Sequence, residues 1–485
     1  MGAGLGREDR TVAVIVPFLC NTLLNFVTGL LLARFLGPAQ YGRLALALAV
    51  AMVIQTVAFD WLRLAAIRFY SERSRAEEPA VRATMDTSFA ILITVLCVGT
   101  VGLMLTQLDL RLPRPLLGLA VAASIANGLF DYHTALVRAR FLDRAYARIV
   151  ISKNLLSLTL TVGGALVFQS AEMAIAGLCV SMGGSVLLSR GTLVDHKATV
   201  RVADRALARR VLGYAIPIVV ANMLYQIIPL TDRAMAASQH GYAVSGQFSL
   251  AYDIGFRIAS AIGSTMDIIL FQMAVRLHEK HGAERAKEAV ARNVGIVLAI
   301  LAPSLAGLWI VLPSFEWLVV PPEFHGHFSH YLTLLMPGLF CYALIHWAVN
   351  PMFQIGKRTG MLIAAALTAS AANAGLLLVM PAATDASDYA IAQSCALAVG
   401  LAVLLLLAVR VQPVWPRLRD VVLPLLCTAV MVGVLLPLRS AMAPGVVALL
   451  VQAACGAILY AGMALALDLC GIRALLRGHL RPAAA

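Results

Sequence analysis

Long apolar segments dominate the sequence, and arginine is concentrated in every second connection between them. A helix needs about 20 apolar residues to cross the hydrocarbon core of a bilayer, and hydrophobic residues make up 60% of this chain. The pattern predicts an all-α integral membrane protein with about 14 transmembrane helices. The predicted spans are roughly 12–33, 42–62, 86–106, 115–137, 149–168, 172–189, 211–231, 245–271, 294–313, 331–353, 360–380, 388–409, 420–438 and 445–468.

The positive charges favour one side of the membrane. When residues near the ends of these approximate spans are assigned to the adjoining connections, thirty-one of the 38 Lys and Arg lie on the side of the N-terminus and six on the other, and Arg257 lies well inside a span. The count assigns Arg82 and Lys153 to connections. Such an excess marks the cytoplasmic side and predicts that both termini are cytoplasmic. The net charge of +13 therefore indicates loops facing anionic membrane lipids, with no nucleic-acid partner.

Residue patterns typical of enzymes and cofactor proteins are missing from the sequence. We find no nucleophile elbow, phosphate-binding loop or pair of catalytic carboxylates, so we predict that the protein is not an enzyme. The eight cysteines occur singly, without a Cys-x-x-Cys pair, which indicates neither a disulfide framework nor a zinc site. We expect no cofactor and no metal.

Two hairpins resemble each other. RFLGPAQYGRLALA at 34–47 joins the first two spans, and RAMAASQHGYAVSGQFSLA at 233–251 joins the seventh and eighth, with Gly42 and Gly246 in corresponding places. Six spans lie between them, which predicts a parallel repeat of a kind many transporters use. The alternative is that hairpins in a Gly- and Ala-rich membrane protein look alike by chance.

The repeat predicts the domain organisation. Residues 1–194 form an N-terminal lobe of six spans, and 211–410 form a C-terminal lobe of six spans. Residues 195–210 form a polar, basic linker that we expect to lie along the cytoplasmic surface as an amphipathic segment. Residues 411–485 hold two extra spans and a cytoplasmic tail.

Ionisable residues inside predicted spans are the candidate functional residues, because a charge in a membrane helix is costly and usually faces a cavity. Asp60 and Arg63 are three residues apart in the second helix of the first repeat. Asp253 and Arg257 are four residues apart in the corresponding helix of the second repeat. Both spacings place the pair on one helical face. Arg257 can bind a substrate phosphate from a cavity, since its guanidinium matches phosphate geometry. Alternatively, it only pairs with Asp253.

Other polar residues are candidates with two interpretations each. Arg34 and Arg233 end the first helices of the two repeats and are either interface anchors or cavity residues; Asp232 suggests a local pair with Arg233. Asn25 lies one turn from Asn21 and favours interhelical hydrogen bonding, with sugar contact as the second interpretation. Asp131 and His133 approach the end of a span and can line an entrance.

Several segments resemble a known family. ARFLGPAQYGRLALALA at 33–49 and TDRAMAASQHGYAVSGQFSLAYDIGFRI at 231–258 are similar to the two hairpins of bacterial polysaccharide exporters that flip lipid-linked oligosaccharides. These exporters belong to the multidrug/oligosaccharidyl-lipid/polysaccharide exporter superfamily. PPEFHGHFSHYLTLLMPG at 321–338 and GKRTGMLIAAALTASAANAGLLL at 356–378 resemble later segments of the same family. The resemblance implies two six-helix lobes around a central cavity with alternating access.

The resemblance also implies a function. A flippase of this family moves polyprenyl-pyrophosphate-linked oligosaccharide from the cytoplasmic to the periplasmic leaflet of the bacterial inner membrane, for O-antigen, exopolysaccharide or capsule synthesis. The implied partners are the lipid-linked substrate, a polysaccharide polymerase and other export proteins, with H⁺ or Na⁺ as a candidate coupling ion. One alternative is a cation-coupled multidrug exporter of the same superfamily. Another is a membrane glycan transferase or polymerase, which usually needs a large periplasmic loop.

Overall fold

The computed structural model describes the backbone of residues 7–71, 75, 77–106, 113–195, 198–355, 358–380, 385–411 and 415–473. Helices account for nearly all of these residues, and no strand occurs among them. The predicted all-α fold class is therefore confirmed. The chain divides into two compact units, Met1–Ser249 and Leu250–Ala485. The predicted domain boundaries stay predictions.

The first unit is a helical bundle. Its helices are α1 (Arg7–Phe69), α3 (Pro79–Leu105), α4 (Arg114–Ala139), α5 (Asp143–Leu156), α6 (Gly163–Phe168), α7 (Ala171–Leu188), α8 (Arg190–Leu193) and the first part of α9 (Arg205–Val319). A π-helical turn, Ser157–Val162, joins α5 to α6, so the two form one span. Proline in the first turn of α3 and α4 suits a position where the backbone N–H has no helical partner.

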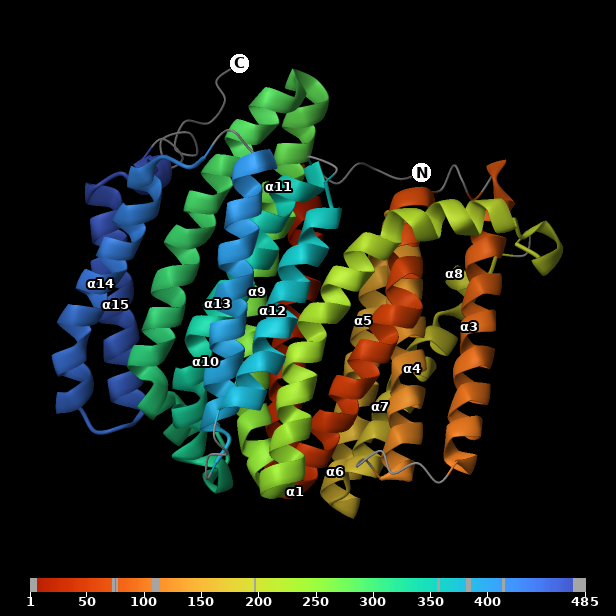
Figure 1. The fold of residues 1–485 in the computed structure, drawn as a ribbon, viewed down its shortest axis with the longest axis horizontal. Coiled ribbons are helices and arrows are strands. Elements are labelled where there is room, and N and C mark those ends of the chain that lie inside the picture. Colours follow the sequence, from red (N-terminus) through yellow and green to blue (C-terminus); the bar gives the residue numbers. More distant parts are fainter. Residues whose placement is uncertain are drawn as a thin grey trace. The chain divides into compact units, whose positions relative to one another are not determined.

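α1 is a hairpin rather than one straight helix. Gly37 has φ 67 and ψ 174, a conformation that glycine adopts without a steric penalty, and the chain reverses there into two arms (Figure 1). Gly241, with φ 85, occupies the corresponding turn of α9. Both turns fall in the two segments that the sequence marks as repeated hairpins.

The two hairpins meet at the glycines that correspond in the repeat. A Cβ atom added to Gly42 would overlap the carbonyl oxygen of Tyr242 and lie 2.9 Å from the nitrogen of Gly246. A Cβ atom on Gly246 would overlap the carbonyl oxygen of Pro38. Small residues let membrane helices approach this closely, so the glycine pair sets the distance between the hairpins.

The second unit contains the rest of α9 and six further helices. These are α10 (His327–Ala343), α11 (Asn350–Ile355), α12 (Gly360–Val379), α13 (Ser387–Val411), α14 (Leu418–Ala441) and α15 (Val446–Ala466). A π-helical turn, Leu344–Val349, joins α10 to α11. α13 packs against α10 and α12, and α14 packs against α15.

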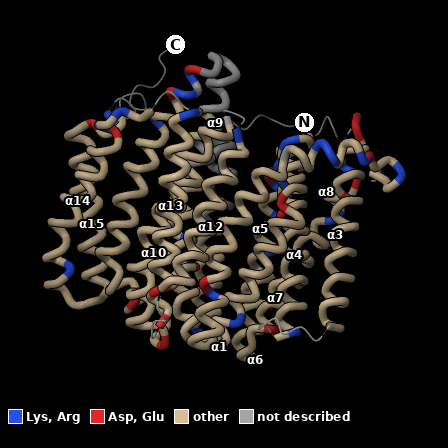
Figure 2. The backbone as a smooth tube through the Cα atoms, viewed as in Figure 1, with Lys and Arg blue, Asp and Glu red and all other residues tan. Residues whose placement is uncertain are grey.

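Both units have the surface of a membrane protein. Large apolar side chains are exposed along their helices; in α3, for example, Val98 and Leu105 are 67% and 81% exposed. In each unit, charged residues gather mainly at helix ends, with uncharged stretches between (Figure 2). Since exposed apolar surface of this extent suits hydrocarbon rather than water, the protein is a multi-pass membrane protein.

Twelve helices in the described part of the chain are long and apolar enough to cross a membrane. Two of them, Asn21–Phe69 and Ala215–Met266, have 49 and 52 residues, far more than the roughly 20 that one crossing needs. Each contains one of the two hairpin glycines. Counting each hairpin as two crossings gives the predicted fourteen spans, a count that stays a prediction.

The predicted linker at 195–210 is helical only towards its end. A short 3-10 turn, Val200–Val202, precedes α9, which begins at Arg205 and first runs across the ends of neighbouring helices (Figure 1). Arg205, Arg209 and Arg210 are exposed, as expected for a surface segment.

Candidate functional site

Asp60 and Arg63 form an ion pair on the second arm of α1. The Nε atom of Arg63 donates to Oδ1 of Asp60 over 3.1 Å, as their spacing predicts. The Arg63 side chain is 35% exposed, whereas that of Asp60 is 12% exposed. The guanidinium therefore keeps an accessible side while one nitrogen holds the carboxylate.

Asp131 on α4 extends this pair into a cluster. The amide of Gln55 on α1 donates to Oδ2 of Asp131 over 2.7 Å. Asp131 also interacts electrostatically with Arg63, Asp60 and Lys153. An isolated carboxylate would be costly inside a membrane helix, and the nearby cations offset that cost. Asp131 thus belongs to the site through contacts between α1 and α4.

Lys153 on α5 is a buried cation that the charge count misplaced. The count assigns it to a connection, but the structure places it in a helix, where the residue is 7% exposed. Its ammonium group donates to Oδ1 of Asn25 over 2.8 Å and to Oδ1 of Asn154 over 3.2 Å. The side chain of Asn21 accepts from both Asn25 and Asn154, over 3.1 Å and 3.0 Å. Asn25 therefore makes interhelical contacts.

These groups form one polar network across both arms of α1 and helices α4 and α5. We call it the α1–α4–α5 network, and its members are Asn21, Asn25, Gln55, Asp60, Arg63, Asp131, Lys153 and Asn154. It combines two cations, two carboxylates and four amides. Guanidinium and ammonium groups bind phosphate, and amides exchange hydrogen bonds with sugar hydroxyls.

The cation of Lys153 should contribute measurably to stability. Replacing Lys153 with methionine leaves amide oxygens of Asn25 and Asn154 without their donor, at a cost of about 1–3 kcal/mol. Thermal unfolding in detergent measures this loss. The matched control is Lys287→Met, because Lys287 is paired with Glu284 over 2.6 Å at the surface, where an ion pair is worth about 0–1 kcal/mol. Equal losses for the two variants would contradict the role assigned to Lys153.

Arg233 and Asp232 contribute to the hairpin contact. Arg233 is 5% exposed, and its Nη1 atom donates to the carbonyl oxygen of Ala45 on α1 over 3.2 Å. Asp232 is fully buried beside it. These contacts place Arg233 between the two hairpins. Arg34, in contrast, is exposed on the first arm of α1. The predicted substrate contacts of all three residues stay predictions.

Asp253 and Arg257 lie on the part of α9 that belongs to the second unit. They are one turn apart, and both side chains are half-buried. Because the Arg257 side chain is only half-buried, part of it is accessible to a ligand. Their predicted role in substrate binding stays a prediction.

A second ion pair, between a buried arginine and a partly exposed aspartate, was not predicted from the sequence. Arg82 was assigned to a connection, but it lies in the first turn of α3 and is 5% exposed. Its Nε atom lies 2.7 Å and 2.9 Å from the two oxygens of Asp86, and the hydroxyl of Tyr132 donates to Asp86 over 2.7 Å. Arg82 and Asp86 are four residues apart, as are Asp253 and Arg257, and this spacing could have predicted the pair.

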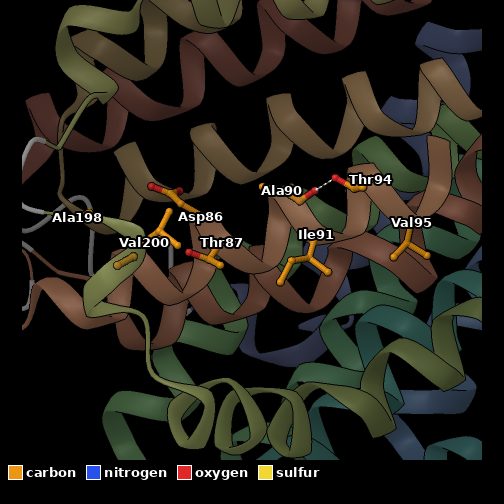
Figure 3. A pocket seen from close by; sticks show the side chains of 9 residues that line it. Asp86, Thr87, Ala90, Ile91, Thr94, Val95, Ala198 and Val200 are labelled. Carbon is orange, nitrogen blue, oxygen red and sulfur yellow. Dashed lines mark hydrogen bonds between the residues drawn. The ribbon is translucent and has the colours of Figure 1, made fainter. Parts of the chain in front are cut away.

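An apolar groove of about 430 Å³ runs along α3 beside this ion pair. Asp86 and Thr87 lie towards one end of the groove, and Ile91 and Val95 line it further along (Figure 3). The membrane-spanning part of α3 is only 6% buried in the protein. The groove thus opens on a surface suited to lipid tails and is separate from the α1–α4–α5 network.

The chain belongs to a family described as polysaccharide biosynthesis proteins, whose model matches residues 31–315. This match confirms the family that the hairpin motifs predict. A search of curated proteins found no match.

Solved structures show the same fold. The chain is similar to a lipid II flippase, MurJ, in an inward closed conformation, with a TM-score of 0.71 and 15% identity over 96% of this chain and 99% of that one. It is also similar to an inward-facing multidrug resistance transporter of the MATE family and MOP superfamily, with a TM-score of 0.57 and 13% identity over 88% of this chain and 99% of that one.

Proposed function

We propose that this polysaccharide biosynthesis protein is a flippase for polyprenyl-pyrophosphate-linked oligosaccharides. It moves them from the cytoplasmic to the periplasmic leaflet of the bacterial inner membrane by alternating access. The observation that carries the proposal is the family match over residues 31–315. The fold that the chain shares with a lipid II flippase supports the same class of transport.

The α1–α4–α5 network supports a substrate with phosphate and hydroxyl groups. Arg63 and Lys153 are cations within membrane-spanning helices, where charge is retained mainly for function. The pyrophosphate of the carrier is the natural partner for such cations. Arg257, in the second unit, is a separate candidate for phosphate contact. The amides of Gln55 and Asn25 fit sugar hydroxyls. The lipid tail stays in the bilayer, so the protein has to accommodate only the head group.

The membrane orientation and partners follow from the same proposal. The basic connections favour cytoplasmic termini, on the side where the proposed lipid-linked substrate is assembled. An inside-negative potential favours outward movement of an anionic head group by about 2.3 kcal/mol per charge and 100 mV. A periplasmic polysaccharide polymerase is the partner that consumes the product, and H⁺ or Na⁺ is the candidate coupling ion.

A deletion strain tests this function directly. Without the protein, the oligosaccharide-linked lipid should accumulate in the cytoplasmic leaflet, and surface polysaccharide should fall to background. Accumulation is measured in intact spheroplasts as protection of the sugar from a membrane-impermeant glycosidase. Drug sensitivity with normal surface polysaccharide would instead favour a multidrug exporter. Shortened oligosaccharide chains on an exposed lipid would favour a glycan polymerase.

A further inference from the structure

A basic cleft of about 860 Å³ lies in the second unit, and none of the residues assigned above to the substrate lines it. It is formed by the part of α9 around Arg285–Arg292, the start of α14 and the 3-10 turn η5 (Leu469–Gly471). Figure 2 draws charged residues at this end of α14 and α15. The cleft therefore lies where membrane helices end and the interfacial region begins.

The cleft carries a positive charge that its own carboxylates do not balance. Four arginines line it, Arg285, Arg292, Arg417 and Arg419, against the three carboxylates of Glu288, Asp420 and Asp468, which leaves one net positive charge. Arg419 donates to the carbonyl oxygen of Leu467 over 2.7 Å. Within the described part of the chain, the side chains of Arg285, Arg292 and Arg417 make no ion pair or hydrogen bond. Three guanidinium groups can therefore turn to a ligand.

The start of α14 adds to this potential. α14 is a 24-residue helix that begins at Leu418, and the first N–H groups of a helix lack intrahelical acceptors and carry a partial positive charge. Trp415, 37% exposed, stands at the rim of the cleft. Tryptophan is enriched at the depth of the lipid head groups.

An apolar stripe leads from the cleft along α14. The stripe consists of Leu418, Val422, Leu426, Val430 and Val434, which recur every four residues and hence form a ridge that winds slowly around the helix. Their exposed fractions are 77%, 40%, 55%, 50% and 57%. A ligand held in the cleft would thus find a continuous hydrocarbon surface beside it. This combination matches a molecule with an anionic head and an acyl tail.

We infer that this cleft binds the phosphate head group of an anionic phospholipid, with an acyl chain along the Leu418–Val434 stripe. A phosphodiester carries one negative charge, which the net charge of the cleft complements, and arginine binds phosphate oxygens in a bidentate manner. Basic pockets between membrane helices bind anionic lipid head groups in this way. The lipid in this cleft is a resident lipid, distinct from the lipid-linked substrate that the protein is proposed to transport.

The test is a binding measurement that needs no transport. Purified protein in neutral detergent is titrated with dioctanoyl phosphatidylglycerol, and the rise in unfolding temperature gives the half-saturating concentration. Dioctanoyl phosphatidylcholine and inorganic phosphate are titrated in parallel. We expect stabilisation by phosphatidylglycerol alone. An equal rise with inorganic phosphate would overturn the assignment to a lipid, and an equal rise with phosphatidylcholine would overturn the role of charge.

Two double variants locate the site. Arg292→Gln with Arg417→Gln should raise the half-saturating concentration roughly 30-fold. Each arginine near an anionic lipid contributes roughly fivefold to the affinity, and the double variant loses two such contributions. The control is Arg205→Gln with Arg209→Gln, which removes the same charge from exposed positions of the first unit and should leave the titration unchanged. Unchanged binding by the first variant, or equal weakening of both, would contradict the site. All four arginines are exposed, so folding should survive.

Discussion

Gly246→Ala is expected to destabilise the protein far more than alanine at a helical glycine with open space around it. The added Cβ atom would overlap the backbone carbonyl oxygen of Pro38, and backbone cannot move aside as a flexible side chain does. The two hairpins must separate, at a cost of about 1–3 kcal/mol or more, as for other overpacked interiors. Thermal unfolding in detergent and the amount of protein in the membrane both measure this effect.

A matched glycine separates this effect from a loss of helix flexibility. Gly99 lies in α3, and a Cβ atom there would have no neighbour within 4 Å. Gly99→Ala should be neutral or slightly stabilising, since alanine favours helices. Gly42→Ala should behave like Gly246→Ala, because its Cβ atom would overlap the carbonyl oxygen of Tyr242. If Gly246→Ala is as stable as Gly99→Ala, the close hairpin contact is wrong.

Arg257→Ala is expected to abolish polysaccharide export while leaving membrane insertion normal. The variant loses a charged group that the proposal places on the substrate's phosphate, and hydrogen bonds to charged groups are worth about 1.5–3 kcal/mol each. Arg257→Lys should retain part of the export, because it keeps the charge but loses the planar fork. Surface polysaccharide and the amount of protein in the membrane are measured together.

The control for Arg257 is another arginine of the second unit. Arg358 is exposed and has no proposed role, so Arg358→Ala should export normally. Full export by Arg257→Ala would reject the phosphate contact and leave the interpretation that Arg257 only pairs with Asp253. If Arg257→Lys exports no more polysaccharide than Arg257→Ala, a positive charge alone is not sufficient at this position.

The fold was largely predictable, because a membrane constrains helices through local sequence. Apolar segments of about 20 residues and short connections follow from the cost of unpaired backbone groups in hydrocarbon. The hairpin turns at Gly37 and Gly241 fall in segments that the sequence marks as repeats. That Gly42 and Gly246 touch is a tertiary contact across some 200 residues of sequence, and no local pattern reveals it.

The candidate site was predictable only where its contacts are local. Asp60 and Arg63 pair within one helical turn, so their spacing was enough. The contact of Asp131 with Gln55 joins α4 to α1, and that of Lys153 with Asn25 joins α5 to α1. Lys153 and Arg82 were missed for a common reason. Counting charges by connection treats every cation near a helix end as solvated, whereas packing against neighbouring helices buries these two.

Transport by the purified protein tests the central claim most directly. The protein is reconstituted into vesicles that contain a fluorescent polyprenyl-pyrophosphate oligosaccharide, and the lipid reaching the opposite leaflet is measured with an impermeant quencher. We predict that the protein accelerates this movement, that the oligosaccharide stays chemically unchanged, and that Arg257→Ala vesicles match protein-free vesicles. Movement no faster than in protein-free vesicles, or conversion of the oligosaccharide to another product, would contradict the account.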